Sequence, residues 1–276
     1  MHSTYCDGKS ELMDYVDQVK KINMISIGFS SHAPVPFPTK WCMKAERFND
    51  YLINIEKIKK LNSFIEIYKG MEVDFIPGVT SPALFREKLD YTVGSIHFIE
   101  NFPDGTPWEI DGTHALFLKG YSEIFNNNIQ DVITRYFDLT REMIATACPS
   151  IVGHLDKIKI QNPDNKFYKE TDTWYQDEVK KTIDLIHSSG AIVEVNTRGI
   201  YQKKTDTTYP SPWILELLYK KNIPVTISSD AHHCDDIINQ FPETAALLKK
   251  IGFKTISVLS GGVWKSFSFS EHGIIR

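Results

Sequence analysis

The chain has 276 residues, of which 42% are hydrophobic and 24% charged, and these proportions exclude a disordered, collagen-like or fibrous protein. Its formal net charge of −4 comes from 31 basic and 35 acidic residues mixed along the chain, which argues against duplex nucleic acid as the main partner. A chain of this length can bury a sizeable core without disulfides or a structural metal, so any metal site is expected to serve chemistry.

The spacing of the cysteines and the absence of long apolar stretches indicate in which cellular compartment the protein is expected. The four cysteines are far apart and include no C-x-x-C pair, which is typical of reduced thiols. The first residues contain no apolar signal core, and no stretch approaches the roughly 18 consecutive apolar residues of a membrane span. We therefore expect a soluble, cytoplasmic protein with no membrane partner, forming one domain over residues 1–276. Its oligomeric state stays open.

Short apolar runs alternate with helical patterns along the chain. Apolar residues spaced three to four apart predict helices near 12–19 and 48–61, while later helices are expected to end at Gly190 and Gly252 or to begin at Ser211-Pro212. Runs rich in Ile, Val, Phe or Tyr predict seven strands, at 22–29, 64–69, 91–96, 150–152, 191–195, 224–227 and 255–259. This alternation predicts an α/β fold built of right-handed βαβ units around a parallel sheet, with an irregular (β/α) barrel favoured over an open sheet.

The segment 98–119 is too long for an ordinary connection between two elements. Among its residues are Trp108, Glu109, Asp111 and His114. Long loops of this kind often form lids or substrate walls.

The ends of the predicted strands carry the informative residues. Five strands end at a residue that can bind a metal, and these are His32, Glu72, His97, His154 and Asp230, the last followed closely by His232. In a parallel barrel the carboxyl ends of all strands lie on one face, so we expect these side chains to converge. A single histidine at a strand end is more often an ordinary hydrogen-bonded residue, but four of the chain's nine occur there. Four other histidines do not fit this pattern and are assigned no metal role: His114, His187, His233 and His272. Of these, His187 is expected near a helix C-terminus, where cations are favoured.

Imidazoles and carboxylates without a thiolate pair suit zinc, manganese or iron, and Glu72 could bridge two ions. Such ions lower the pKa of a bound water to about 7 and neutralise charge on a phosphoryl or carbonyl oxygen. The predicted reaction is hydrolysis with a metal-bound hydroxide as the nucleophile. Arg198 follows the strand at 191–195 and could either bind a phosphate through two parallel hydrogen bonds or pair with a nearby carboxylate.

Seven stretches, in order and spanning nearly the whole chain, resemble the PHP (polymerase and histidinol phosphatase) family of metal-dependent phosphoesterases, in particular its histidinol-phosphate phosphatase branch. They are residues 2–8 (HSTYCDG), 28–34 (GFSSHAP), 70–74 (GMEVD), 94–97 (GSIH), 153–156 (GHLD), 194–199 (EVNTRG) and 229–232 (SDAH).

The resemblance implies a distorted (β/α)₇ barrel that holds three divalent metal ions (Zn, Mn or Fe). It implies one ion on His2, Glu72 and Asp230, a second on Glu72, His97 and His154, and a third on His32, His232 and Asp7. Glu72, Asp230 and His232 would be catalytic, and Arg198 would bind the phosphate. The implied substrate is a small phosphate ester, L-histidinol phosphate, which is cleaved to L-histidinol and phosphate in histidine biosynthesis.

One stretch departs from the family pattern. The first family motif is His-x-His, and only its second histidine, His2, is present, since the first would fall immediately before Met1. We therefore expect the first strand of the barrel to be truncated and the first ion to be weakly held.

Three alternatives remain at this stage. The chain could act on another phosphate ester or on nucleic-acid ends, as polymerase-associated relatives do. It could also bind metal without catalysis, as a sensor does. An amidohydrolase-type barrel acting on an amide or lactone shares the logic of metal ligands at strand ends, but it typically needs a bridging lysine or a His-x-His start, and neither is visible.

Overall fold

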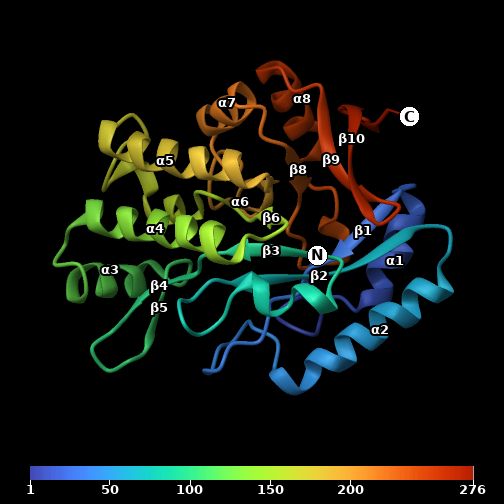
Figure 1. Ribbon diagram of the computed structural model, residues 1–276, viewed down its shortest axis with the longest axis horizontal. Coiled ribbons are helices and arrows are strands. Elements are labelled where there is room, and N and C mark those ends of the chain that lie inside the picture. The colour runs from blue at the N-terminus through green and yellow to red at the C-terminus, as the bar shows by residue number, and fades with distance from the viewer. Residues whose placement is uncertain (276) are drawn as a thin grey trace.

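The computed structural model describes residues 1–275, and its centre is a curled parallel sheet of six strands in the order β1-β2-β3-β6-β7-β8 (Figure 1). The strands are β1 (Ser26–Phe29), β2 (Glu66–Asp74), β3 (Tyr91–Ser95), β6 (Ile151–Val152), β7 (Ile192–Asn196) and β8 (Val225–Ser228). The prediction of an α/β fold with a barrel-like parallel sheet is confirmed. The parallel sheet contains six of the seven predicted strands.

The seventh predicted strand belongs to a different sheet. Strand β9 (Thr255–Ser260) pairs in antiparallel register with β10 (Val263–Ser270), which pairs in turn with β11 (Gly273–Ile274). Gly261 and Gly262 connect β9 to β10, and both have positive φ, 62° and 76°, as tight hairpin turns require. A connection of two residues can join only antiparallel strands, so this part of the chain leaves the βαβ pattern.

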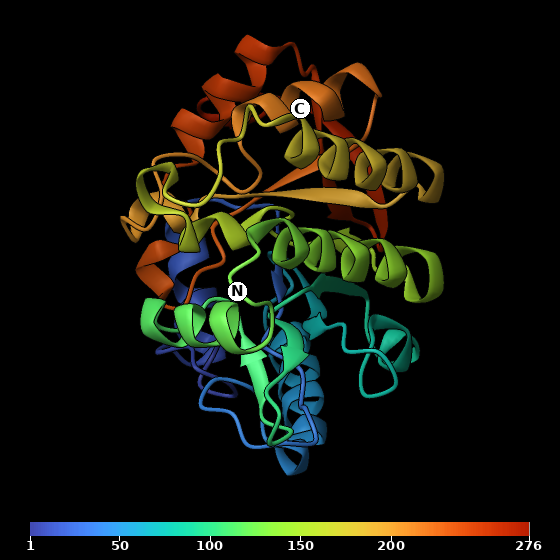
Figure 2. The same cartoon turned by 90° about the vertical axis from the view of Figure 1, so that its left-hand side faces the viewer.

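Helices cover the outside of the sheet, and two views at right angles show them on its flanks (Figures 1 and 2). They are α1 (Leu12–Lys21), α2 (Phe48–Leu61), α3 (His114–Glu123), α4 (Ile129–Ala147), α5 (Thr173–Ser189), α6 (Arg198–Tyr201), α7 (Pro212–Lys220) and α8 (Phe241–Ile251). The predicted boundaries are confirmed where punctuation is strong: α5 ends at Gly190 in the left-handed conformation, and α7 begins with a proline after Ser211. No helix within residues 1–275 is long and apolar enough to cross a bilayer.

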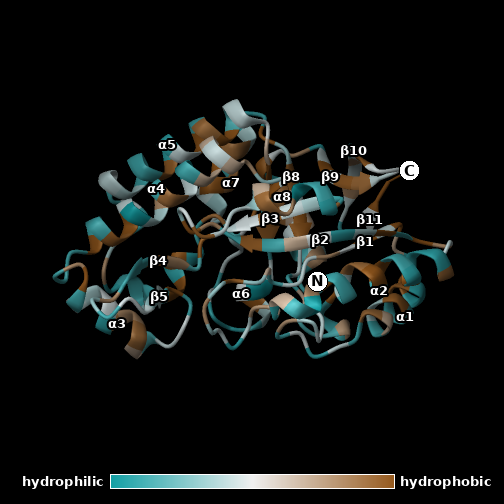
Figure 3. Ribbon diagram, turned by 60° about the horizontal axis from the view of Figure 1, so that its bottom comes forward, coloured by the Kyte–Doolittle hydropathy of each residue, from teal (hydrophilic) through white to brown (hydrophobic). Residues whose placement is uncertain are grey.

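Apolar faces of these helices build two main cores against the sheet (Figure 3). In α4 the buried residues recur every three to four positions, from Val132 and Tyr136 to Met143 and Ala147. They pack with α5 and α7 in the larger core, while α1 and α2 pack against β1 and β2 in the smaller one.

The segment 98–119 is mostly ordered secondary structure. Strands β4 (Phe98–Asn101) and β5 (Pro107–Glu109) form an antiparallel hairpin, and α3 follows it. Trp108 is fully buried and its indole Nε1 donates to the Leu116 carbonyl, so this ring belongs to the core rather than to a substrate wall. Glu109 and Asp111, in contrast, line a cavity described below.

The curled sheet is open between β1 and β8, its two terminal strands. A cavity of about 640 Å³ lies there, lined mainly by apolar residues of β1, β8, α8 and the β9–β10 hairpin. Met1 and His2 lie at one end of this opening: the Ser30 amide donates to the Met1 carbonyl at 2.9 Å, and the His2 amide donates to the Ala231 carbonyl at 2.8 Å. These two bonds place the His2 ring between the ends of β1 and β8.

Candidate metal centre

Side chains from the ends of five strands meet at one rim of the sheet. His32 follows β1, Glu72 lies within β2, and His97, His154 and Asp230 each stand two residues beyond β3, β6 and β8. All five are buried. The convergence that parallel strand ends predict is therefore present, and Glu72 lies further inside its strand than predicted because β2 continues to Asp74.

The first group of candidate ligands surrounds the His2 ring. Its Nε2 lies 3.1 Å from Oε2 of Glu72 and 3.0 Å from Oδ1 of Asp230. Cys6 Sγ lies 3.6 Å from the other ring nitrogen, Nδ1. One imidazole and two carboxylates thus point at a single spot.

The second group surrounds the other oxygen of Glu72. Its Oε1 lies 3.0 Å from Nε2 of His154 and 3.5 Å from Nε2 of His97, and the two imidazole nitrogens are 3.2 Å apart. Each oxygen of Glu72 therefore faces a different set of imidazoles.

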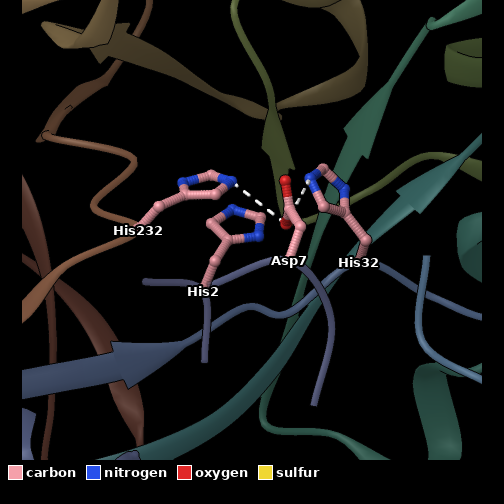
Figure 4. Close-up of side chains that lie close together, drawn as sticks. All are labelled: His2, Asp7, His32 and His232. Atoms are coloured by element: carbon pink, nitrogen blue, oxygen red, sulfur yellow. Dashed lines mark ion pairs between the residues drawn. The ribbon is translucent and has the colours of Figure 1, made fainter. Parts of the chain in front are cut away.

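The third group consists of Asp7, His32 and His232, which lie beside the His2 ring (Figure 4). Oδ1 of Asp7 is 3.2 Å from Nε2 of His232 and 3.9 Å from Nε2 of His32. The His2 and His232 rings stack with centroids 4.1 Å apart, so the first and third groups adjoin.

These donor sets fit divalent ions. Tetrahedral coordination at about 2.0–2.1 Å requires donor atoms about 3.3 Å apart, and most of the separations in the first two groups are close to that value. Two imidazole nitrogens directed at each other and at one carboxylate oxygen are typical of ligands around a cation. His32 Nδ1 and His154 Nδ1 are buried without a hydrogen-bond partner among the described residues.

Hydrogen bonds behind the candidate ligands orient them. Nδ1 of His97 lies 2.9 Å from Oδ1 of Asp74, and Nδ1 of His232 lies 2.9 Å from the Asp230 carbonyl oxygen. Because Nδ1 makes these contacts, Nε2 of each ring is free to face the cluster. Ser95 Oγ donates to Oε1 of Glu72 at 2.8 Å. Sequence reasoning assigned no role to Asp74, although Glu72 and Asp74 are two apart in a strand and share a face.

The carboxylates of the cluster are ionised at neutral pH. Burial by itself would raise the pKa of Glu72, but His32, His154 and His2 hold it well below its usual value. The pKa of Asp230 is likewise lowered well below its usual value, because the hydrogen bond from His2 and the charge of Arg198 outweigh burial. Burial lowers the pKa of His97, but the Asp74 carboxylate overrides it and raises this pKa to about 9.

Asp230 has a positive φ of 48°, which is uncommon for a residue other than glycine. Its Oδ2 accepts a hydrogen bond from Asn196 Nδ2 at 3.2 Å, and its carbonyl accepts one from Arg198 Nη1 at 2.9 Å. Neighbouring polar groups therefore stabilise the unusual backbone conformation of this candidate ligand.

A polar cavity of about 160 Å³ opens directly onto the cluster. Three cationic side chains line it: Arg198 from α6, Lys157 from the short 3-10 helix Lys157–Gln161, and Lys204. Lys157 Nζ lies 2.8 Å from Oδ2 of Asp111 and 3.2 Å from Nε2 of His97. Burial would lower the pKa of Lys157, but Asp111 raises it, so the ammonium stays charged. Sequence reasoning found Arg198 and missed both lysines, because neither belongs to a recognisable motif.

The remaining histidines lie outside these three groups. Nδ1 of His114 lies within hydrogen-bond distance of Oε1 of Gln161. His187 stands in the last turn of α5, as predicted, and His233 contacts its near neighbour Asp235. His272 is an exposed residue between β10 and β11.

Comparison with known proteins supports this description. The model of the PHP domain family matches residues 1–198. A histidinol-phosphatase of Bacillus subtilis is 25% identical over 260 residues, covering 86% of this chain and 93% of the relative, and a probable histidinol-phosphatase of Schizosaccharomyces pombe is 23% identical over 271 residues, covering 92% and 85%. A crystal structure of a Listeria monocytogenes protein superimposes with a TM-score of 0.75 at 19% identity, covering 88% of this chain and 97% of that one. A Lactococcus lactis histidinol phosphate phosphatase, solved with zinc, L-histidinol and phosphate, superimposes with a TM-score of 0.68 at 17% identity and covers 100% and 97%. The family match over residues 1–198, together with the shared fold, shows that this chain belongs to the PHP domain family.

Proposed function

We propose that this chain is a divalent-metal-dependent phosphatase that hydrolyses L-histidinol phosphate to L-histidinol and inorganic phosphate. The observation that carries the proposal is the juxtaposition of three groups of metal-ligand side chains with a cavity lined by three cations. The names of the relatives from Bacillus subtilis and Schizosaccharomyces pombe support it, as do the zinc, L-histidinol and phosphate in the Lactococcus lactis structure.

Three ions of zinc, manganese or iron are proposed for the cluster. His2, Glu72 and Asp230 would hold the first, and Glu72, His97 and His154 the second. The third would be held by Asp7, His32 and His232. When bound, such ions supply a water of lowered pKa and neutralise the charge that builds up on phosphoryl oxygens.

The chain's own residues would bind and orient the phosphate. Arg198 is held in place because its Nη1 donates to the Asp230 carbonyl, which leaves the rest of its guanidinium to face the cavity. Planar guanidinium groups bind phosphate through paired hydrogen bonds, and Lys157 and Lys204 add two point charges. Together these three cations offset the charge of a phosphate monoester before it reaches the candidate ligands.

The size of the polar cavity favours a small ester. About 160 Å³ accommodates a compact molecule, whereas binding of a nucleic-acid strand uses a longer basic groove with aromatic platforms. The net charge of −4 also disfavours a polyanionic substrate.

The test is phosphate release by protein loaded with Zn²⁺ or Mn²⁺. We expect kcat/KM for L-histidinol phosphate to exceed that for glucose 6-phosphate and for 5′-phosphorylated single-stranded DNA by at least about tenfold, which corresponds to roughly 1.4 kcal/mol. Arg198→Ala should raise KM at least about tenfold, while Arg135→Ala, a half-buried arginine that pairs with Glu100 on β4, should leave it unchanged. Metal-loaded protein that releases no phosphate from any of these esters would overturn the proposal.

A further inference from the structure

We propose that Asn196 is a positioning residue that fixes two candidate metal ligands and the phosphate-binding arginine relative to one another. This inference rests on the proposed function and deepens it, because it assigns a residue that joins the metal cluster to the cation-lined cavity.

Strand β7 contributes no side chain to the three groups of candidate ligands, although both of its neighbours in the sheet lead to one. Strand β6 leads to His154, and β8 leads to Asp230. Glu194 and Asn196 lie two positions apart on β7, so their side chains share a face, and both are buried. Strand β7 therefore places two polar side chains between the candidate ligands of its neighbours.

The side-chain amide of Asn196 donates hydrogen bonds toward both neighbours. Its Nδ2 lies 3.2 Å from Oδ2 of Asp230, whose other oxygen, Oδ1, faces His2. The same Nδ2 lies 3.1 Å from Oε2 of Glu194, and that oxygen also accepts the His154 backbone amide at 2.8 Å. Because β6 consists of only two residues, this last bond holds the backbone beyond its end. One amide group therefore contacts a candidate ligand of the first ion and the support of a candidate ligand of the second.

The oxygen of the same amide contacts the segment that carries the phosphate-binding arginine. Oδ1 of Asn196 accepts the Arg198 backbone amide at 2.8 Å, at the start of α6. The guanidinium of Arg198 in turn donates through Nη1 to the Asp230 carbonyl at 2.9 Å. Asn196, Arg198 and Asp230 thus form a closed ring of hydrogen bonds that joins the first ion site to the cavity.

These contacts explain why the position suits asparagine. Nδ2 faces two carboxylate oxygens, while Oδ1 faces an N–H group. Turning the amide over would place Oδ1 against both carboxylates, and Asn196→Asp would do the same with an added negative charge. The backbone is also constrained, because the Asn196 amide donates to the Tyr209 carbonyl at 2.7 Å and the Tyr209 amide donates back at 3.0 Å. The side chain therefore projects from a fixed point, with its donors and acceptor matched to their partners.

The test measures zinc binding and phosphate binding separately, and neither readout needs turnover. Metal-free protein is titrated calorimetrically with Zn²⁺, and zinc-saturated protein is titrated with inorganic phosphate. Asn196→Asp keeps the volume of the side chain but removes its donors, and Asn196→Ala removes the whole amide. We expect both variants to bind zinc about 10–100-fold more weakly, because a ligand loses its outer partner. Phosphate binding should weaken by about tenfold, because Arg198 loses an anchoring hydrogen bond.

Asn62→Ala is the matched control. Asn62 is also a buried asparagine, and its Nδ2 donates to the Ile58 carbonyl at the end of α2. This variant should lower the free energy of unfolding in urea, because a buried hydrogen bond is lost, but it should leave zinc and phosphate binding unchanged.

A double variant distinguishes positioning from a general loss of structure. If Asn196 acts on phosphate through Arg198, adding Asn196→Ala to Arg198→Ala should weaken zinc binding but should weaken phosphate binding no further. Full additivity of the two losses in phosphate binding, or unaltered zinc binding in both Asn196 variants, would overturn the inference. Failure of the wild-type protein to hydrolyse L-histidinol phosphate would instead overturn the proposed function, and these titrations would still decide the role of Asn196.

Discussion

Replacing Glu72 with glutamine tests the architecture of the cluster most directly. Oε2 of Glu72 lies 3.1 Å from His2 Nε2, and Oε1 lies 3.0 Å from His154 Nε2, so one side chain serves two candidate ion sites. Losing even an outer partner of a metal ligand typically costs 10–100-fold in affinity or activity. If the losses at two sites multiply, Glu72→Gln should lower kcat/KM for L-histidinol phosphate by about 10²- to 10⁴-fold.

The assay pairs elemental analysis with phosphate release. Purified wild-type and variant proteins are dialysed against metal-limited buffer, their metal content per chain is measured, and turnover is then recorded. Glu56→Gln is the matched control because Glu56 lies on α2, away from the cluster, and pairs with Lys69. His187→Ala should be equally silent. If Glu72→Gln keeps the metal content and the turnover of Glu56→Gln, Glu72 is not a shared ligand and the reasoning is wrong.

Three further predictions follow from buried contacts. Asp74→Asn should weaken the ion site of His97 by about 10–100-fold, because the imidazole loses its charged acceptor; zinc titration by calorimetry checks this, and an unchanged affinity contradicts it. In metal-free protein the pKa of His97 is about 9, above its unfolded value, so its stabilising contribution is complete below about pH 6.5 and disappears as the pH rises through 9. The difference in free energy of unfolding between wild type and His97→Gln, measured in urea at pH 6 and pH 9.5, should therefore shrink at the higher pH. Gly120→Ala would place a Cβ 2.2 Å from Trp108 Cε2 and should cost about 1–3 kcal/mol of stability, whereas Ser122→Ala, exposed on the same helix, should change it little in the same urea measurement.

Local patterns in the sequence determined helices α1 and α2, the ends of several later helices, the six parallel strands and the rim to which the strand ends point. Periodic apolar residues and end signals act over a few positions, which is why α2 occupies the predicted range 48–61 and α5 ends at Gly190. Parallel strand ends share one edge of a sheet, so the convergence of His97 and His154 could be expected before any coordinates.

Only the tertiary structure decided which partners these elements took. The run at 255–259 predicts a strand equally well in either sheet, and the two-residue Gly261-Gly262 turn, followed by an unpredicted strand, placed it in the antiparallel one. The support of His97 by Asp74, and the position of Lys157 beside Asp111, depend on contacts between segments 23 to 46 residues apart. Side-chain pairing over such distances is set by packing of the whole sheet and leaves no local signal, so the sequence indicated the candidate ligands but not the residues that hold and surround them.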